Sequence, residues 1–221
     1  MHDTWHIIWQ LLPRSTLQTL YMTICSTILS CTMGFPLGAL LFVSSPSGFK
    51  PRRLIYNILS RIVNLFRSFP FIILMVILIP FSRKIVGTAI GPTAVLIPLS
   101  IAAAPFVARI VETALTEVDG GVILAARSMG STNMQVLLKV MVPEAMPALV
   151  SGLALTIITI IGYSAMAGAL GGQGLGDMAI TQGYYHFRWD VAWAAIIVIL
   201  LMIELFQAAG TIISRSLLSK R

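Results

Sequence analysis

The stretch STLQTLYMTICSTILSCTMGFPLGALLFVSSPSGF, Ser15–Phe49, contains no charged residue. An α-helix rises about 1.5 Å per residue, so roughly 20 apolar residues cross the ~30 Å hydrocarbon core of a bilayer. The stretch is long enough to do so, as are the uncharged runs Ile85–Ala108 and Ala145–Gly176. Because 57% of the chain is hydrophobic and only 10% is charged, a water-soluble fold could not cover its apolar surface. The sequence therefore predicts an all-α integral membrane protein.

Five membrane-spanning helices are predicted within one membrane domain that covers residues 1–221. Their approximate bounds are 17–42, 58–81, 86–110, 148–170 and 191–213. The second span carries Arg61 and Arg67 in its first turns, where long basic side chains can extend to the membrane interface. The fifth contains Glu204 near its middle, and an ionisable residue at such a position is expected to face the bundle interior or water.

The distribution of lysine and arginine predicts the orientation, because cytoplasmic segments are enriched in both. With the N-terminus outside, the inner segments hold eleven of the fifteen basic residues. These are Lys50, Arg52, Arg53, Arg61, Arg67, Arg109, Arg127, Lys139, Arg215, Lys220 and Arg221. The C-terminus and the segment 120–143 are therefore expected in the cytoplasm. The same asymmetry accounts for the net charge of +7, so we expect contact with membrane lipids and no nucleic-acid partner.

The segment 120–143 has the pattern of two short amphipathic helices between the third and fourth spans. Apolar residues recur at i, i+3, i+4 and i+7 in both halves. They are Val122, Ala125, Ala126 and Met129 in the first half, and Met134, Leu137, Leu138 and Met141 in the second. Helices this short are unstable alone in water, so an apolar face must rest on something. The pattern leaves open whether that is the membrane surface, the helix bundle or a groove on a partner protein.

Helix-capping residues delimit this hairpin. Asp119 can cap the start of the first helix, and Gly130 suits the left-handed turn that ends it. Thr132-Asn133-Met134-Gln135 has the spacing of a capping box at the start of the second helix. Pro143 and Pro147 are expected to end the hairpin before the fourth span, since proline removes a backbone donor.

The hairpin also carries a recognisable motif. The segments AARSMG (Ala125–Gly130) and VMVPEAMP (Val140–Pro147) resemble the signature loop of ABC importer permeases, which reads Glu-Ala-Ala, three residues, Gly, and then a downstream proline. Leu124 stands where that family has glutamate. In the family this loop is a coupling helix that docks into a cleft on a cytoplasmic ATPase. The resemblance implies ATPase-coupling residues at Ala125, Ala126, Arg127, Met129, Gly130, Met134, Leu137 and Leu138.

Four further segments look like those of methionine ABC importer permeases. They are FRSFPFIIL (Phe66–Leu74), IPFSRKIVGTAIG (Ile79–Gly91), APFVARIVETAL (Ala104–Leu115) and GYSAMAGALGGQGLG (Gly162–Gly176). Gln173, in the last of them, departs from the family pattern. The resemblance runs from about Leu17 to Arg215, and it implies the ABC type I importer permease fold, with five transmembrane helices and a cytoplasmic coupling-helix hairpin.

The same resemblance implies an assembly and a function. A homodimer of this subunit in the bacterial inner membrane would bind two ATPase subunits and an extracytoplasmic methionine-binding lipoprotein. It would move D- or L-methionine by alternating access. ATP and Mg²⁺ would be bound by the ATPase, and the chain itself lacks the phosphate-binding motif G-x-x-x-x-G-K-[ST]. No catalytic residue, cofactor or metal site is predicted in this chain.

The end of the fourth span is rich in glycine. Glycines occur at positions 162, 168, 171, 172, 174 and 176, and small residues permit close helix packing and irregular backbone beside a cavity. We expect the span to break here, near the outer gate and the dimer interface. Tyr163, Ser164 and Met166 are candidate pathway or gate residues, with simple packing as the alternative. Glu204 is a further candidate, and a hydrogen-bonded structural role is its alternative.

Two other functions stay open from the sequence. One is an ABC importer permease for another small polar solute, such as a different amino acid or a phosphonate. The other is an intramembrane hydrolase, because GYSAM begins like the nucleophile elbow G-x-S-x-G. Met166 replaces the last glycine of that motif, and no histidine lies inside a predicted span to act as a base.

Overall fold

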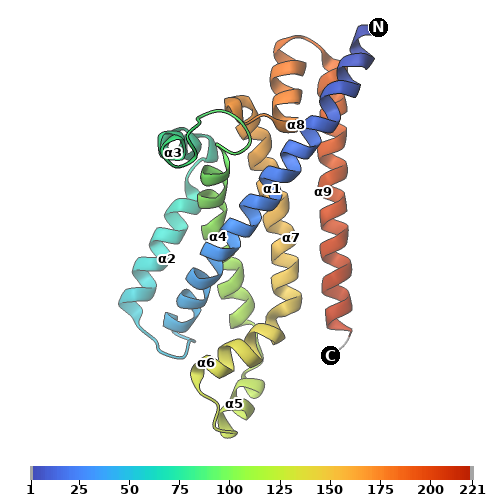
Figure 1. Cartoon of the computed structure of the whole chain (residues 1–221). Coiled ribbons are helices and arrows are strands. Elements are labelled where there is room, and N and C mark those ends of the chain that lie inside the picture. The colour runs from blue at the N-terminus through green and yellow to red at the C-terminus, as the bar shows by residue number, and fades with distance from the viewer. Residues whose placement is uncertain (1, 220–221) are drawn as a thin grey trace. The chain divides into compact units, whose positions relative to one another are not determined.

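The structure is a computed structural model that describes the backbone of residues 2–219 and the side chains of residue 6 and residues 8–219. Lys220 and Arg221, which contribute to the charge distribution above, lie outside the described residues. Within residues 2–219 the chain is helical and contains no strand (Figure 1). The all-α fold class is confirmed.

Nine α-helices and three π-helical segments follow one another along the described residues. They are α1 (His2–Ser44), α2 (Arg53–Ser68), α3 (Phe71–Val86), α4 (Leu96–Thr116), α5 (Gly120–Ser128), α6 (Asn133–Gln135), η1 (Val136–Met141), α7 (Val142–Ala167), η2 (Gly168–Gly172), α8 (Gly174–Asp177), η3 (Met178–Tyr185) and α9 (Trp189–Leu218). By length and composition, four stretches could each cross a membrane: Ile8–Ser44, Leu96–Thr116, Asn133–Gly172 and Trp189–Leu218.

The span expected at 58–81 is broken in the structure. The helices α2 and α3 meet at a bend of 102°, and only as a pair do they count as a fifth candidate span. Pro70 lies at the break in an extended conformation, with φ −60° and ψ 123°. A residue that precedes proline is disfavoured in helical backbone angles, which is consistent with the end of α2 at Ser68, just before Phe69 and Pro70. The expected straight span is therefore replaced by a bent pair.

The third expected span, 86–110, corresponds to α4. This helix begins at Leu96, ten residues after the expected start. Gly87 and Gly91 have φ values of +86° and +104°, which a right-handed helix does not contain. Gly87 ends α3, and its N–H donates to the Arg83 carbonyl oxygen. Pro92 follows Gly91 directly. Residues 87–95 therefore form a loop, and α4 begins after it at Leu96.

The expectation that Pro143 and Pro147 end the hairpin is wrong. Helical backbone runs from α6 through η1 into α7, and Pro147 lies inside α7. Pro143 lies within this continuous helical stretch, directly after the π-helical segment η1, and it removes one backbone donor there. In the π-helical turn before it, the Val142 N–H donates to the Leu137 carbonyl oxygen, so the hydrogen-bond pattern changes just ahead of the proline.

The chain divides into two compact units, which are described separately. The first unit comprises Met1–Ser30, Phe69–Ala103 and Thr156–Gln207. Its described part has two apolar clusters, one around Met22, Met75 and Leu99 and the other around Ile161, Leu175 and Val191. The side chains of all six are almost fully buried, and together they hold the glycine-rich segment that follows α7.

The second unit comprises Cys31–Ser68, Ala104–Leu155 and Ala208–Arg221. Its main cluster joins residues of α1, α4, η1 and α7, with Phe42, Val107, Leu115 and Met141 among the buried members. A smaller cluster of Leu41, Val63 and Ala108 connects α1, α2 and α4. This unit contains the whole hairpin, so the hairpin rests on a core that the chain itself provides.

Candidate functional site

The hairpin of α5, α6 and η1 has one face packed against the core of the second unit. Val136, Leu137 and Met141 are buried members of the main cluster there, and Ile123 and Ala126 pack against it half-buried. Burial of these side chains removes apolar area from water and stabilises both short helices. The sequence left open what the hairpin rests on, and the structure shows that one face packs on the bundle of its own chain.

The predicted helix caps are all present. The Gly121 N–H donates to Asp119 Oδ1 at 2.6 Å, and Gly130 has a left-handed φ of +83°. At α6 the Gln135 N–H donates to Thr132 Oγ1 at 3.4 Å, and the Thr132 N–H donates to Gln135 Oε1 at 2.8 Å. Backbone donors at both helix starts are thus satisfied within the hairpin.

A second apolar face of the hairpin is uncovered. The exposed apolar side chains are Val122, Leu124, Met129, Met134 and Leu138, and Ala125 is exposed beside them. Met129 alone is 86% exposed. The eight expected coupling residues therefore do not share one face: Ala126 and Leu137 face the core, whereas Ala125, Met129, Met134 and Leu138 lie outside. Apolar residues occupy both faces, and only one face has a partner within the second unit.

Arg127 holds the two arms of the hairpin together. Its guanidinium carbon lies 5.0 Å from the centre of the Phe49 ring, and its Nη2 donates to Asn133 Oδ1 at 3.4 Å. Phe49 in turn meets Phe42 edge to face, with ring centres 5.5 Å apart. An arginine over an aromatic face is attracted by the ring quadrupole. Arg127 thereby ties α5 to α6 and to the loop that follows α1.

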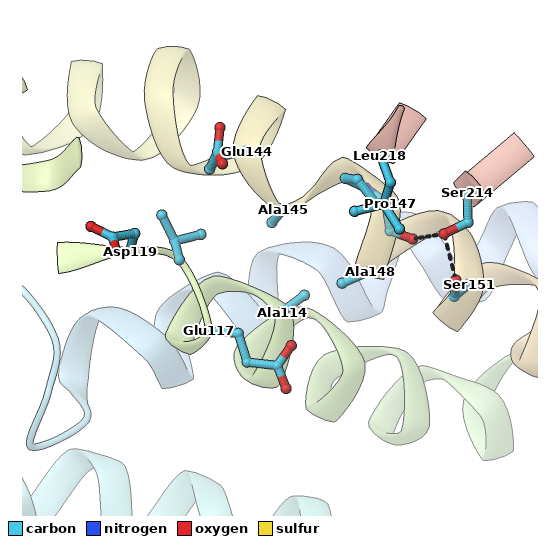
Figure 2. A pocket seen from close by; sticks show the side chains of 11 residues that line it. Ala114, Glu117, Asp119, Glu144, Ala145, Pro147, Ala148, Ser151, Ser214 and Leu218 are labelled. Atoms are coloured by element: carbon cyan, nitrogen blue, oxygen red, sulfur yellow. Dashed lines mark hydrogen bonds between the residues drawn. The ribbon is translucent and has the colours of Figure 1, made fainter. Parts of the chain in front are cut away.

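A cavity of about 460 Å³ lies where α4, α7 and α9 meet beside the start of α5 (Figure 2). Glu117, Asp119 and Glu144 are among its lining residues. At its other side Ser214 Oγ donates to the Pro147 carbonyl oxygen at 2.9 Å, and Ser151 Oγ donates to Ser214 Oγ at 2.9 Å. These hydrogen bonds fasten the last turns of α9 to the first turns of α7, which carry the hairpin.

A polar network around Arg109 was not foreseen from the sequence. Arg109 Nη1 lies 2.6 Å from Glu112 Oε2, and its Nη2 donates to Asn64 Oδ1 at 3.0 Å and to the Ser60 carbonyl and hydroxyl oxygens. Both side chains of the ion pair are largely buried. The network joins α4 to α2. The sequence signal for the ion pair is the i, i+3 spacing of Arg109 and Glu112 in the segment ARIVE. The contacts with α2 have no such local signal.

The three candidate gate residues on α7 lie within one turn but have different surroundings. Tyr163 stacks on Phe71 of α3, with ring centres 4.4 Å apart and planes 2° from parallel. Ser164 is buried, and its hydroxyl donates to the Ile161 carbonyl oxygen at 2.8 Å. Met166 is exposed, as is Glu204 on α9. The hydroxyl of Ser164 thus has a partner in its own helix, which does not suit an activated nucleophile.

The expected break after the fourth span is present. Leu170 and Gly171 leave helical angles inside η2, and positive φ values follow at Gln173 (+61°) and Gly174 (+81°). The Gly91 N–H donates to the Gly171 carbonyl oxygen at 2.8 Å, so the loop before α4 supports the broken segment. Among the described residues, no group of three or more His, Cys, Asp or Glu side chains could hold a metal ion.

Known proteins match the chain over nearly its whole length. Residues 34–219 fit the family described as binding-protein-dependent transport system inner membrane component. A probable D-methionine transport system permease protein of Pasteurella multocida is 46% identical over 203 residues, which are 92% of this chain and 94% of that protein. The methionine import system permease protein of Bacillus subtilis is 43% identical over 208 residues, 94% of this chain and 93% of that protein.

A solved structure agrees with these relatives. An inward-facing structure of a methionine ABC transporter superposes with a TM-score of 0.92 at 44% identity, and the match covers 95% of this chain and 97% of that one. Both the hairpin and the glycine-rich segment lie inside the matched family range.

Proposed function

We propose, because the chain belongs to the binding-protein-dependent transport system inner membrane component family, that it is the membrane-spanning subunit of an ATP-driven methionine importer. The observation that carries this proposal is the extent of the likeness to methionine permeases, 46% identity over 92% of the chain. The matched length, 203 residues of this chain and 94% of that relative, covers nearly the whole of both proteins.

The uncovered apolar face of the hairpin is the proposed contact with the ATPase. Met129, Met134 and Leu138 would enter a groove on that partner, which is how short amphipathic helices are commonly recognised. Ala126 and Leu137 support them from beneath, and Gly130 and Arg127 fix the angle between the two arms. In this assignment the eight coupling residues act as one body, with some in contact and the rest holding them in place.

The proposed assembly is the one that the resemblance to methionine ABC importers implies. Two copies of this subunit would pair in the bacterial inner membrane, each resting on an ATPase subunit that binds ATP and Mg²⁺. An extracytoplasmic methionine-binding lipoprotein would deliver the substrate. The excess of lysine and arginine supports an external N-terminus and a cytoplasmic C-terminus, which puts the hairpin on the side of the ATPase.

Transport would proceed by alternating access. Closure of the two ATPases on ATP would draw the docked hairpins together, and the helices joined to them, α4 and α7, would follow. A joint transmits such a movement only if it is stiff. The caps, the Arg127 contacts and the Ser214 hydrogen bonds supply that stiffness in this chain. Tyr163, Ser164 and Met166 would then lie at or near the gate.

The substrate is tested by ATP-dependent uptake of labelled methionine into proteoliposomes that contain this subunit, its ATPase and its binding protein. We expect uptake that excess unlabelled D- or L-methionine suppresses and that leucine or a phosphonate leaves unchanged. Suppression by the phosphonate alone would assign the subunit to a different solute.

The docking face is tested by replacing Met129 and Met134 together with glutamate. Two carboxylates cannot enter an apolar groove without a large desolvation cost, so copurification of the ATPase should fall at least tenfold. Ser47→Glu is the matched control, because Ser47 is also exposed on the second unit but lies outside the hairpin. Equal recovery of the ATPase with both variants would contradict the assigned face.

A further inference from the structure

We propose that Gln18 and Thr19 of α1 are positioning residues for the gate, because they clasp the broken segment Gly171–Leu175. Gln18 Nε2 donates to Gln173 Oε1 at 2.7 Å, and the Gly174 N–H donates to Gln18 Oε1 at 3.1 Å. The Leu175 N–H donates to Thr19 Oγ1 at 2.9 Å. All these residues belong to the first unit. The inference rests on the proposed function, since it assigns the segment to a gate.

The clasp satisfies backbone donors that local structure leaves without a partner. The first N–H groups of a helix have no acceptor inside the helix, and the residue before it usually caps them with its own side chain. Gln173 occupies that position at α8 but makes no such hydrogen bond. Two side chains of α1, more than 150 residues away in sequence, accept these hydrogen bonds instead. In an apolar medium, unpaired N–H groups at this point would be costly.

The fit between α1 and the segment is close. A Cβ atom built on Gly174 would lie 2.7 Å from Thr19 Oγ1 and 2.8 Å from Met22 Cε, and the φ of Gly174 is +81°. A larger residue would therefore strain the backbone and displace these two side chains. Thr19 and Leu175 are both almost fully buried. Because the Gly91 N–H bonds to the Gly171 carbonyl oxygen, the segment is held at both ends.

The clasp and the gate candidate Tyr163 share one apolar cluster. Met22, one turn beyond Gln18 and Thr19, is a buried member of the cluster that also contains Phe71 and Ala167. Tyr163 and Leu170 pack against the same cluster, and Tyr163 stacks on Phe71. A shift of the segment relative to α1 would therefore disturb the Tyr163–Phe71 stack. In this way α1 sets the position in which the gate is held.

The amide pair also accounts for a departure from the family pattern. Glutamine at position 173 has a positive φ of +61°, a backbone conformation that L-residues with side chains rarely adopt. Its amide group is matched by the amide of Gln18, so the unusual residue has a dedicated partner. The two positions are expected to act as a pair, and a change at either one should remove most of what the double change removes.

The clasp is tested by the labelling of a buried cysteine in the purified full-length subunit. The reporter is Ala167→Cys in a Cys25→Ala, Cys31→Ala background, because Ala167 is fully buried in the shared cluster. Thr19→Val keeps the side-chain shape and removes the acceptor, and it should speed labelling by a small thiol reagent about tenfold. Thr19→Ser restores the hydroxyl and should return the rate to that of the parent.

Thr16→Val is the matched control for this labelling. It removes a hydroxyl from the same helix, but Thr16 Oγ1 donates only to the Leu12 carbonyl oxygen of its own helix, so the rate should stay unchanged. Equal acceleration by Thr16→Val and Thr19→Val would overturn the clasp. So would additive effects of Gln18→Leu and Gln173→Leu in the double variant.

The role in gating is tested by the number of substrate molecules moved per ATP hydrolysed in proteoliposomes. Thr19→Val should lower this ratio at least threefold at equal membrane content, and Thr19→Ser should restore it. An unchanged ratio would overturn the positioning role. Labelling needs neither ATPase nor substrate. If the reporter subunits label as expected but the wild-type complex does not move methionine, the proposed function is refuted and the clasp still stands.

Discussion

Replacing Gly130 with valine places a β-branched side chain at a backbone φ of +83°. A Cβ atom added at this position meets no atom within 4 Å, so the cost comes from the backbone alone. Left-handed angles cost an L-residue about 1–2 kcal/mol, and a β-branched one lies at the upper end. A cost of about 2 kcal/mol corresponds to a roughly 30-fold loss of the native turn relative to its alternatives.

The consequence should be confined to the hairpin. Ile123 and Ala126 hold α5 on the core, and the turn at Gly130 only sets how α5 meets α6. We therefore expect Gly130→Val to insert in the membrane at normal levels. Uptake, and the stimulation of ATP hydrolysis by substrate-loaded binding protein, should fall to a few per cent of wild type.

The assay compares a graded series with a matched control in proteoliposomes. Asparagine tolerates left-handed angles better than alanine, and alanine better than valine, so activity should fall in the order Gly130, Gly130→Asn, Gly130→Ala, Gly130→Val. Gly120→Val is the control, because Gly120 has ordinary φ and equally open surroundings in the same hairpin. Wild-type uptake by Gly130→Val, or equal loss in Gly120→Val, would refute the reasoning.

Three further outcomes are expected. Thr132→Ala removes the capping box of α6 and should cost about 1 kcal/mol, seen as faster proteolysis within the hairpin, whereas Thr132→Ser should behave as wild type. Arg109→Gln leaves the largely buried Glu112 without its partner, at a cost of about 3 kcal/mol, so the thermal midpoint of the purified subunit should fall. Glu112→Gln should lower the midpoint less. The reverse order would contradict the ion pair as the source of the stability. Glu204→Gln should leave methionine uptake unchanged, and a tenfold loss would place this carboxyl in the pathway.

Features governed by local rules could be predicted from the sequence. Asp119, Gly130 and the Thr132–Gln135 box act through hydrogen bonds or backbone angles within a few residues, so their spacing was sufficient. The break after the fourth span followed from its glycines for the same reason. The helical class followed from charge-free runs whose length is set by the bilayer.

Features governed by distant partners could not be predicted in this way. Arg109 meets Ser60 and Asn64 across more than 40 positions, and Gln18 meets Gln173 across 155. No periodicity within one helix signals such a pair. The two-sided hairpin was missed because a pattern of i, i+3, i+4 spacing identifies apolar residues but not which of them the rest of the chain covers. The bend at Pro70 was missed because the uncharged run Ser68–Ser82 is too short to cross a bilayer, so the predicted span was extended back through the break to residue 58.

The hairpin that is seated on its own core has a consequence for how a complex would be built. A docking element that is already folded loses little conformational freedom when it meets a partner, so recognition can be rapid and reversible without a slow ordering step. The same arrangement leaves a subunit without its partner with methionine and leucine side chains open to any apolar surface nearby. Balanced synthesis of this subunit and its ATPase would then limit the number of unassembled subunits that aggregate or are degraded.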